Sequence, residues 1–346
     1  MKIIYVSTKT KKYPVYFPEE KEGLSECFLP ENAYENKKVL VVTDTNLLKL
    51  YKDMLFELRK KVADLSVFII EAGENSKTLS VCERITDTLA ANKFTKADIV
   101  AAFGGGVVCD IAGFAASIYR RGTGLIMCPT SLLAMADASV GGKNGVDSPF
   151  GKNILGTVYQ PDAVIINRGF LKTLPGQIRS EGMAEIIKAA VLTGDRSLSL
   201  YNAVGYKAEI VAEDEFDTGK RHILNLGHTI GHALELLSDY NVPHGVCVGI
   251  GLYKTAVLAE KHGLCDRETA DFIEKSLRDN GLETGIENIE ELKNITPEDL
   301  YNAVLEDKKI SGDRLFAVIP RKMGAADITG LSFETLKKLS EEFFDE

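Results

Sequence analysis

Short apolar runs alternate with amphipathic stretches along the first half of the chain. Five of these runs are rich in Val, Ile, Leu and Ala and contain few polar residues: 39–43, 66–70, 98–103, 124–128 and 163–167. Continuous apolar runs of this length are typical of strands that are buried on both faces of a parallel sheet. We therefore predict an α/β fold for this half.

The pattern changes at about residue 171, where helical periodicity takes over. Beyond that point only LFAVIP, residues 315–320, has the pattern of a strand. A chain of 346 residues also exceeds what one hydrophobic core usually serves. We predict two domains, a Rossmann-like nucleotide-binding α/β domain over 1–170 and an all-α domain over 171–346. Ligand pockets favour domain interfaces, so we expect the active site between them.

Composition argues against several classes of function. The net charge of −9 and the lack of a long Lys/Arg run leave no clustered basic surface for nucleic acid. The six cysteines contain no CxxC pair, which favours reduced thiols over a disulfide framework. The N-terminus lacks the apolar core of a signal peptide and no apolar stretch is long enough to span a membrane. We expect a cytoplasmic protein.

Three glycines, Gly104, Gly105 and Gly106, join the third predicted strand to a helical pattern. They would let backbone N–H groups approach a phosphate at a helix N-terminus, although a tight turn without a ligand explains them equally. The spacing is not that of the dinucleotide fingerprint, because Asp110 stands where its third glycine would fall. Asp110 suits a ribose or nicotinamide-side group or a local cap, and Asp44 after the first strand is a second acidic candidate.

The stretch NLGHTIGHALE, residues 225–235, holds two of the five histidines of the chain. On one continuous helix, four polar residues would fall within about 60° of one another and oppose an apolar face. They are Arg221, Asn225, His228 and His232. Solvated faces usually carry Lys and Glu, so this set favours ligand contacts. Gly227 and Gly231 predict close packing against another element, because each costs a helix interior ~1 kcal/mol.

Two imidazoles four residues apart can ligate one metal, but a catalytic zinc needs three protein ligands and one open position. His244 is the best third candidate, whereas His222 and His262 lie at less suitable positions. The stretch has no glutamate at the second position of its HxxxH, so the general base of an HExxH metalloprotease is missing. Proteolysis is therefore disfavoured.

A group of cations in and near the loop VGGKNGVDSPFGKN would give this acidic chain a site for an anion, although surface lysines often serve solubility alone. The group comprises Arg121, Lys143, Lys152 and Lys188, with Asn153 beside them. Lys188 also stands three residues after Glu185 in a segment of Ala, Met and Ile, where burial would force the two to pair.

Seven motifs, in this order, resemble those of the 3-dehydroquinate synthase family. They are GGGVVCDIAGFAASIYRRG, CPTSLLAMADASVGGKNGVDSPFGKN, LPGQIRSEGMAEIIK, KAEIVAEDE, RHILNLGHTIGHALE, PHGVCVGIG and EDKK. The resemblance implies a homodimeric cytosolic lyase of the shikimate pathway, on the route to chorismate and the aromatic amino acids, with NAD and one divalent metal, zinc or cobalt, as cofactors. It implies conversion of 3-deoxy-D-arabino-heptulosonate 7-phosphate to 3-dehydroquinate and phosphate, through transient oxidation at C5, elimination, re-reduction, ring opening and aldol closure.

The resemblance also implies individual roles, carried over motif by motif. The metal ligands would be Glu185, His228 and His244, which leaves His232 as a substrate contact. The NAD contacts would be Asp44, Glu74, Lys77, Gly105, Gly106, Asp110, Thr130, Ser131, Lys143, Lys152 and Thr173. The substrate contacts and catalytic residues would be Asp137, Lys143, Asn153, Lys188, Lys207, Arg221, Asn225, His232 and one of Lys308 and Lys309, and Arg121 is similar to the arginine that reaches the partner subunit's site.

Three other functions compete with this one. Another sugar phosphate cyclase, such as 2-deoxy-scyllo-inosose synthase, typically differs from the pattern seen here at Asp110, Lys143, Arg221 and Asn225. A metal-dependent polyol dehydrogenase of similar fold would release NADH and has no need of so many cations. A non-catalytic nucleotide or metal sensor would be expected to have lost some of the site residues that this chain retains.

Overall fold

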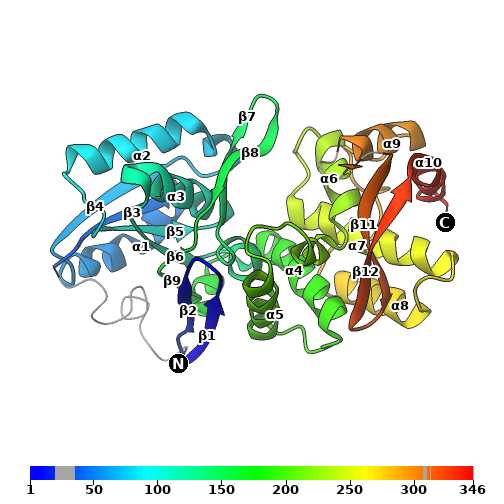
Figure 1. Cartoon of the computed structure of the whole chain (residues 1–346), viewed down its shortest axis with the longest axis horizontal. Helices are drawn as coiled ribbons and strands as arrows, with labels where there is room; N and C mark the ends of the chain where they lie inside the picture. The colour runs from blue at the N-terminus through cyan, green and yellow to red at the C-terminus, as the bar shows by residue number, and fades with distance from the viewer. Residues whose placement is uncertain (20–35, 307–309, 312, 346) are drawn as a thin grey trace. The chain divides into compact units, whose positions relative to one another are not determined.

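The computed structural model describes residues 1–19, 36–306, 310–311 and 313–345, which form two compact units (Figure 1). Unit 1 comprises Met1–Pro175 and Lys207–Phe216, and unit 2 comprises Gly176–Tyr206 and Asp217–Glu346. The chain therefore leaves unit 1 after Pro175 and returns to it for one short segment. Lys308 and Lys309, one of which is a predicted substrate contact, lie outside the described residues.

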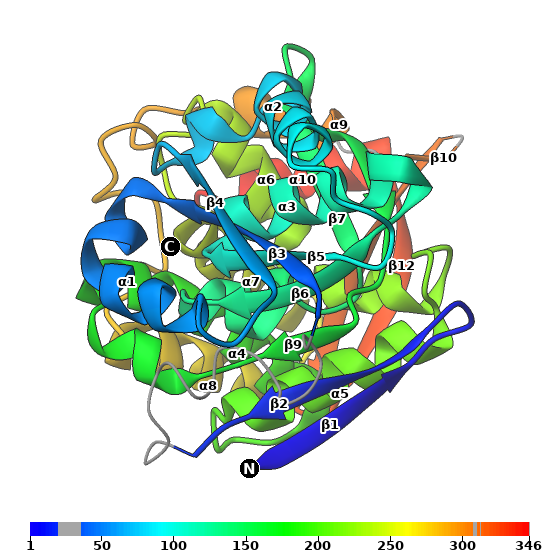
Figure 2. The same cartoon turned by 90° about the vertical axis from the view of Figure 1, so that its left-hand side faces the viewer.

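Unit 1 is built on a seven-stranded sheet of order β1-β2-β9-β6-β5-β3-β4 (Figure 2). Its strands are β1 (Lys2–Ser7), β2 (Lys12–Phe17), β3 (Lys38–Asp44), β4 (Asp64–Ile70), β5 (Ile99–Gly104), β6 (Gly124–Pro129) and β9 (Ala163–Ile165). The five predicted runs become β3, β4, β5, β6 and β9, which pair in parallel and confirm the α/β prediction. The antiparallel pair of β1 and β2 adds an edge that the search for continuous apolar runs missed, because half-buried strands alternate.

The order of the strands determines where the helices of unit 1 lie. The chain steps from β3 outward to β4 and then returns past β3 to β5. Right-handed crossovers therefore put α1 (Thr45–Leu58) on one face of the sheet and α2 (Leu79–Ala91) and α3 (Gly106–Ile118) on the other (Figure 1). The reversal point between β3 and β5 is where open α/β sheets bind ligands, outside the carboxyl ends of the strands.

The predicted Gly/Pro/Asp-rich loop is a two-stranded hairpin, β7 (Lys143–Ser148) and β8 (Gly151–Val158). A Cβ on Gly145 would lie 2.8 Å from the Leu155 carbonyl oxygen, and one on Gly156 would lie 2.4 Å from that of Asn144. These glycines thus let the two backbones pair closely. Short helical turns complete the unit: η1 (Glu74–Ser76), η2 (Tyr119–Arg121), the π-helical η3 (Ala134–Ala138) and η4 (Arg168–Lys172).

Unit 2 is mostly helical, as predicted. Its helices are α4 (Gly176–Thr193), the first half of α5 (Leu200–Glu213), η5 (Lys220–Asn225), α6 (His228–Leu237), α7 (His244–Lys261), α8 (Arg267–Asp279), α9 (Pro297–Leu305) and α10 (Phe333–Glu342). It also contains a three-stranded antiparallel sheet of β10 (Ile310–Ser311), β11 (Arg314–Lys322) and β12 (Ala325–Ser332). The predicted strand 315–320 lies in β11, and its neighbours carry too few consecutive apolar residues to be recognised.

Helix α7 lies at the centre of unit 2. Two apolar clusters pack against it, one through Cys247, Ile250 and Ala259 and the other through Val248, Leu252 and Ala256. A helix that is apolar on most sides is a buried helix. None of the described helices is long and apolar enough to cross a membrane. The cysteines that the structure describes are buried, and none of them forms a disulfide with another described residue.

The histidine stretch does not form one continuous helix, so the prediction of a single polar stripe is wrong. Arg221 and Asn225 lie on the 3₁₀ turn η5, whereas α6 begins at His228. Gly227 between them has a φ of 79°, in the left-handed region that favours glycine, and it interrupts the helical path. Only His228 and His232 therefore share a helical face.

The same glycines bring α6 against α7. A Cβ on Gly227 would lie 2.8 Å from the backbone nitrogen of Leu252, and one on Gly231 would lie 3.1 Å from the Cα of Val248. A Cβ on Gly251 of α7 would lie 2.1 Å from the carbonyl oxygen of Gly227. The predicted close packing at Gly227 and Gly231 is thus confirmed, and it joins backbone to backbone.

Gly227→Ala should destabilise the protein by about 2–4 kcal/mol, because alanine would adopt a left-handed conformation and also overlap α7. Urea-induced unfolding measures the loss. Gly263→Ala is the matched control, because Gly263 has a φ of 67° and no neighbouring atom within 4 Å of the added Cβ. It should lose only about 1–2 kcal/mol. Equal losses in the two variants would show that the contact between α6 and α7 contributes nothing.

Candidate active site and metal centre

The carboxyl ends of β3 and β5 lie side by side at the reversal point of the sheet, since Val42 pairs with Ala102 in parallel. Asp44 ends β3, and its Oδ1 accepts backbone N–H bonds from Asn46 at 2.8 Å and from Leu47 at 2.9 Å. This predicted NAD contact is therefore the N-cap of α1. The cap holds a carboxylate at the place where a dinucleotide would bind in such a sheet.

Gly105 and Gly106 begin α3 directly after β5. A Cβ on Gly104 would lie 2.4 Å from Val108, so packing alone requires glycine there. A Cβ on Gly105 would instead lie 3.5 Å from Ser131, and one on Gly106 would lie 3.8 Å from Ala138, both ordinary contacts. The fold therefore has room for a side chain at both positions. Glycine at these two positions suits a phosphate that approaches the helix N-terminus closely.

A buried ion pair joins η1 to the first turns of α3. Lys77 Nζ lies 2.6 Å from Asp110 Oδ2. Burial alone would lower the pKa of Lys77, but the charges of Asp110 and Glu74 outweigh it and raise that pKa. Burial likewise outweighs the nearby ammonium and raises the pKa of Asp110 to about 6. Both groups are therefore charged at neutral pH, and the pair anchors two predicted NAD contacts.

The remaining predicted NAD contacts of unit 1 follow β6, lie on the hairpin or follow η4: Thr130, Ser131, Lys143, Lys152 and Thr173. Lys152 Nζ lies 3.4 Å from Glu74 Oε1, which links the hairpin to η1. The hydroxyl of Thr173 lies 2.6 Å from that of Tyr51. Glu74 therefore interacts with two lysines, with Lys152 through this ion pair and with Lys77 through its charge.

Two predicted substrate contacts, far apart in sequence, meet in unit 1. Asp137 lies on η3, and π-helical turns occur frequently at functional sites. The buried Lys207 donates hydrogen bonds to the Asp137 carboxylate and, over 2.6 Å, to its carbonyl oxygen. The ammonium is thereby held at one place against a carboxylate.

Two further predicted residues have left-handed backbones. Arg121 has a φ of 63° and Asn153 a φ of 54°, and the adjacent Arg120 has a φ of 51°. Residues other than glycine adopt this conformation rarely and at some cost, and such residues cluster at functional sites. The turn after α3 thus holds two consecutive arginines in a conformation that carries some energetic cost.

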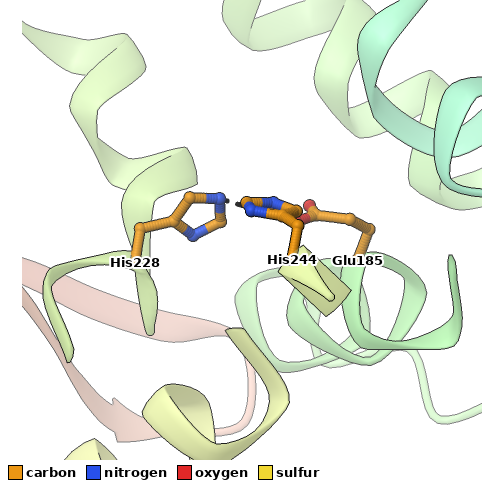
Figure 3. A group of neighbouring side chains, drawn as sticks. All are labelled: Glu185, His228 and His244. Atoms are coloured by element: carbon orange, nitrogen blue, oxygen red, sulfur yellow. Dashed lines mark ion pairs between the residues drawn. The ribbon is translucent and has the colours of Figure 1, made fainter. Parts of the chain in front are cut away.

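Three donor side chains from three helices converge in unit 2 (Figure 3). Glu185 lies on α4, and His228 and His244 are the first residues of α6 and α7. Glu185 Oε1 lies 3.5 Å from His228 Nε2 and 3.7 Å from His244 Nε2. Ligand atoms about 2.1 Å from a tetrahedral ion stand about 3.4 Å apart, so the spacing fits a metal such as zinc. Two imidazoles and one carboxylate are also a catalytic donor set, which leaves one position open.

The other ring nitrogens of these histidines are held by the protein. His228 Nδ1 lies 3.2 Å from the carbonyl oxygen of Leu226, which can only accept, so Nδ1 carries the proton. His244 Nδ1 is hydrogen-bonded to Glu235 Oε1. Metal-binding histidines almost always use their second nitrogen in this way. Both Nε2 atoms are therefore directed to the Glu185 side, as metal binding requires.

The surroundings of His244 favour positive charge. Burial alone would lower the pKa of His244, but hydrogen bonds and charges from Glu185 and Glu235 outweigh it and raise that pKa to about 10. The same carboxylates would favour a divalent cation at this point. Lys188 forms a buried ion pair with Glu185, as the sequence predicts, and so balances part of the negative charge.

His228 and His232, four residues apart, do not belong to the same group of possible metal ligands. The structure brings together two groups of donors among the residues it describes, and His228 belongs to only one of them. The second group consists of the exposed His232 with Glu235 and His244. The sequence interpretation missed Glu235. It follows His228 by seven residues, which puts it about 20° away on α6, and that spacing was the available signal.

Comparison with known proteins places the chain in a known family. The N-terminal 3-dehydroquinate synthase model matches residues 67–181, and the C-terminal model matches residues 197–310. A 3-dehydroquinate synthase from Lactiplantibacillus plantarum is 42% identical over 81% of this chain and 81% of its own length. One from Legionella pneumophila is 41% identical over 93% of this chain and 91% of its own length.

Solved structures share the fold at lower identity. A 2-deoxy-scyllo-inosose synthase, complexed with carbaglucose-6-phosphate, NAD+ and Co2+, superposes with a TM-score of 0.84 at 21% identity and covers 99% of both chains. A 2-epi-5-epi-valiolone synthase from Streptomyces hygroscopicus, with NAD+ and Zn2+ bound, has a TM-score of 0.84 at 24% identity and covers 96% of both. At this level of identity the likeness establishes the fold.

Lys77→Met should destabilise the protein more at about pH 8 than at about pH 5. Methionine removes the ammonium, so the pKa of Asp110 should rise further above about 6. The wild-type carboxyl also has a raised pKa, so both proteins lose stability between the ordinary carboxyl pKa and about pH 6, and the difference between them should grow from about pH 6 up to the higher folded pKa of the variant. We expect a loss of about 3 kcal/mol at the higher pH, measured by urea-induced unfolding.

The matched control is Lys60→Met, because the pair of Lys60 and Glu57 is exposed. It should lose less than about 1 kcal/mol at either pH. A loss for Lys77→Met that does not change with pH would contradict a buried charge pair.

Proposed function

The chain belongs to the 3-dehydroquinate synthase family, and on that premise we propose that it converts 3-deoxy-D-arabino-heptulosonate 7-phosphate to 3-dehydroquinate and phosphate. The enzyme is a carbon–oxygen lyase of the shikimate pathway, on the route to chorismate and the aromatic amino acids. The observation that carries the proposal is the convergence of Glu185, His228 and His244 in a chain of this family. The Nδ1 atoms of both histidines are hydrogen-bonded to the protein, so their Nε2 atoms are the ones that can bind a metal.

The cofactors are NAD and one divalent metal, zinc or cobalt. Related cyclases bind these groups, and the residues present fit both. When bound, NAD accepts and returns a hydride at C5 of the substrate, while the metal polarises the C5 hydroxyl. Glu185, His228 and His244 hold the metal, and NAD is regenerated within each turnover.

The residues of unit 1 hold the dinucleotide. Gly105 and Gly106 admit its pyrophosphate to the N-terminus of α3, where backbone N–H groups and the helix dipole favour negative charge. Asp44 and Asp110 contact its hydroxyl or amide groups. The ion pair of Asp110 and Lys77 keeps this carboxylate oriented.

The polar groups of the substrate are matched by cations of the chain. Lys143, Lys152, Asn153 and Arg121 bind the phosphate, and Arg221 with Lys207 binds the carboxylate. Asp137 orients the Lys207 ammonium, to which it is hydrogen-bonded. Lys188, Asn225, His232 and one of Lys308 and Lys309 complete the substrate contacts. Each of these assignments follows the matching position of the family motif.

The protein acts as a homodimer in the cytoplasm. Arg121 matches the arginine that reaches the partner subunit's site in this family, and this match supports the dimer. Size-exclusion chromatography with light scattering measures the mass of the assembly.

Two rival activities predict different products. An inosose-forming cyclase would accept a substrate without a carboxylate, and a polyol dehydrogenase would accumulate NADH. The relatives of highest identity reported above are 3-dehydroquinate synthases, whereas the inosose synthase shares only the fold. Arg221, buried on η5, is a cation suited to the substrate carboxylate.

Metal-loaded protein should release one phosphate for each heptulosonate phosphate consumed, with NAD present only in catalytic amount. The hydride returns to C5, so NADH should not accumulate. A phosphate assay and NADH absorbance, followed together, measure the two quantities. Steady formation of NADH, or no release of phosphate, would refute the proposal.

His228→Ala should lose metal and activity together, with metal affinity weakened by more than about 100-fold, beyond the cost of changing a group outside the ligand shell. His232→Ala should keep the metal and lose turnover by about 100-fold or more, as expected for a residue that contacts only the substrate. Metal content after dialysis and kcat give both readouts. Equal loss of metal in the two variants would show that the ligand set is misassigned.

A further inference from the structure

Glu235 is a buried carboxylate with no role in the function described so far. It lies on α6, and 6% of the residue is exposed. Neighbouring Ala233 and Leu234 belong to the apolar core of unit 2. A carboxylate in such surroundings is costly unless it is paired or hydrogen-bonded. Its presence therefore calls for a specific partner.

That partner is His244, whose Nδ1 is hydrogen-bonded to Glu235 Oε1. The opposite nitrogen of the same ring, Nε2, lies 3.7 Å from Glu185 Oε1. A cation that binds on the side of Glu185 and His228 displaces the proton at Nε2, while the proton at Nδ1 stays hydrogen-bonded to Glu235. Glu235 thus determines which nitrogen of His244 can bind a cation.

The register of the two helices brings these residues together. Gly227 packs against Leu252 and Gly231 against Val248, so α6 and α7 run antiparallel and a step of four along α6 matches a step of four along α7. The next step brings Glu235 level with His244. The backbone packing therefore places the two side chains within reach of each other.

We propose that Glu235 is a positioning residue of the metal centre, which fixes the ring of His244 with Nε2 toward the ion and strengthens cation binding. The inference rests on the proposed metal site. A carboxylate behind a metal-binding imidazole orients the ring and makes it a more basic ligand. The Nδ1 of His228 is hydrogen-bonded to a neutral backbone carbonyl, whereas that of His244 is hydrogen-bonded to a carboxylate. Of the two ligand histidines, His244 is therefore the one whose basicity a carboxylate raises.

Glu235 also belongs to a second group of donors, with His232 and His244, in which it would itself be a metal ligand. The geometry argues against that role. Glu235 Oε1 and His244 Nδ1 are in direct hydrogen-bond contact, closer than two ligand atoms of a tetrahedral ion stand. Neither of these two atoms can bind the ion while they share a proton.

The test is the zinc affinity of the full-length, metal-free protein, measured by competition with a chromophoric chelator. Glu235→Gln keeps the shape of the side chain and removes its charge. Affinity should weaken by about 10–100-fold, as expected for support of a ligand, while saturation still reaches one zinc per chain. The visible spectrum of the cobalt-loaded variant should remain that of the same coordination number.

Glu215→Gln is the matched control, because Glu215 is also a buried carboxylate, accepting hydrogen bonds from Thr10 and Gln160 in unit 1. It should leave zinc affinity within about threefold of wild type, whatever it does to thermal stability. If Glu235→Gln also stays within about threefold, Glu235 is a structural residue and the inference fails. If Glu235→Gln and His232→Ala both abolish stoichiometric zinc, Glu235 is a ligand and the inference fails as well.

His228→Ala separates this inference from the function it rests on. Loss of zinc in His228→Ala with unchanged affinity in Glu235→Gln would leave the metal site in place and overturn only the role of Glu235. Unchanged zinc affinity in His228→Ala would overturn the metal site and this inference together.

Discussion

The backbone contact between α6 and α7 is the constraint on which the proposed metal centre depends. Gly227, Gly231 and Gly251 allow the two helices to approach until carbonyl, amide and Cα atoms touch. That approach fixes the antiparallel register, and the register determines which side chains of α6 stand beside the start of α7. This register places His228 and His244, at the starts of the two helices, where both side chains reach Glu185.

Burial then requires that every polar group of the centre be held by another. Glu185 and Lys188 pair within α4, and Glu235 supports His244 from α6. Removing charges and imidazoles from water costs free energy unless such partners exist. The same hydrogen bonds and ion pairs that offset this cost also fix the orientation of the side chains. The result is a donor set whose two Nε2 atoms already face Glu185, which lowers the ordering required when a cation binds.

Unit 1 obtains its site from topology rather than from close packing. The strand order reverses between β3 and β5, so their carboxyl ends form the crevice that parallel sheets offer to ligands. Asp44 caps the helix after one strand, and Gly105 opens the helix after the other. The pair of Lys77 and Asp110 then fastens the neighbouring η1 to the same helix. The proposed dinucleotide site therefore combines residues from several elements of the fold.

The sequence by itself determined the parallel sheet, because continuous apolar runs have few alternatives to burial on both faces, and it determined that Gly227 and Gly231 lie against another element. It also carried the family resemblance, which assigns Glu185 as a ligand. Residue spacing could not tell whether His232 joins His228, because a four-residue interval reports only one helical face. The tertiary structure decided that His228 points to residues of two other helices, that the helix breaks at Gly227, and that Glu235 stands behind the site. These facts depend on the register between helices, which is set by backbone contacts distant in sequence.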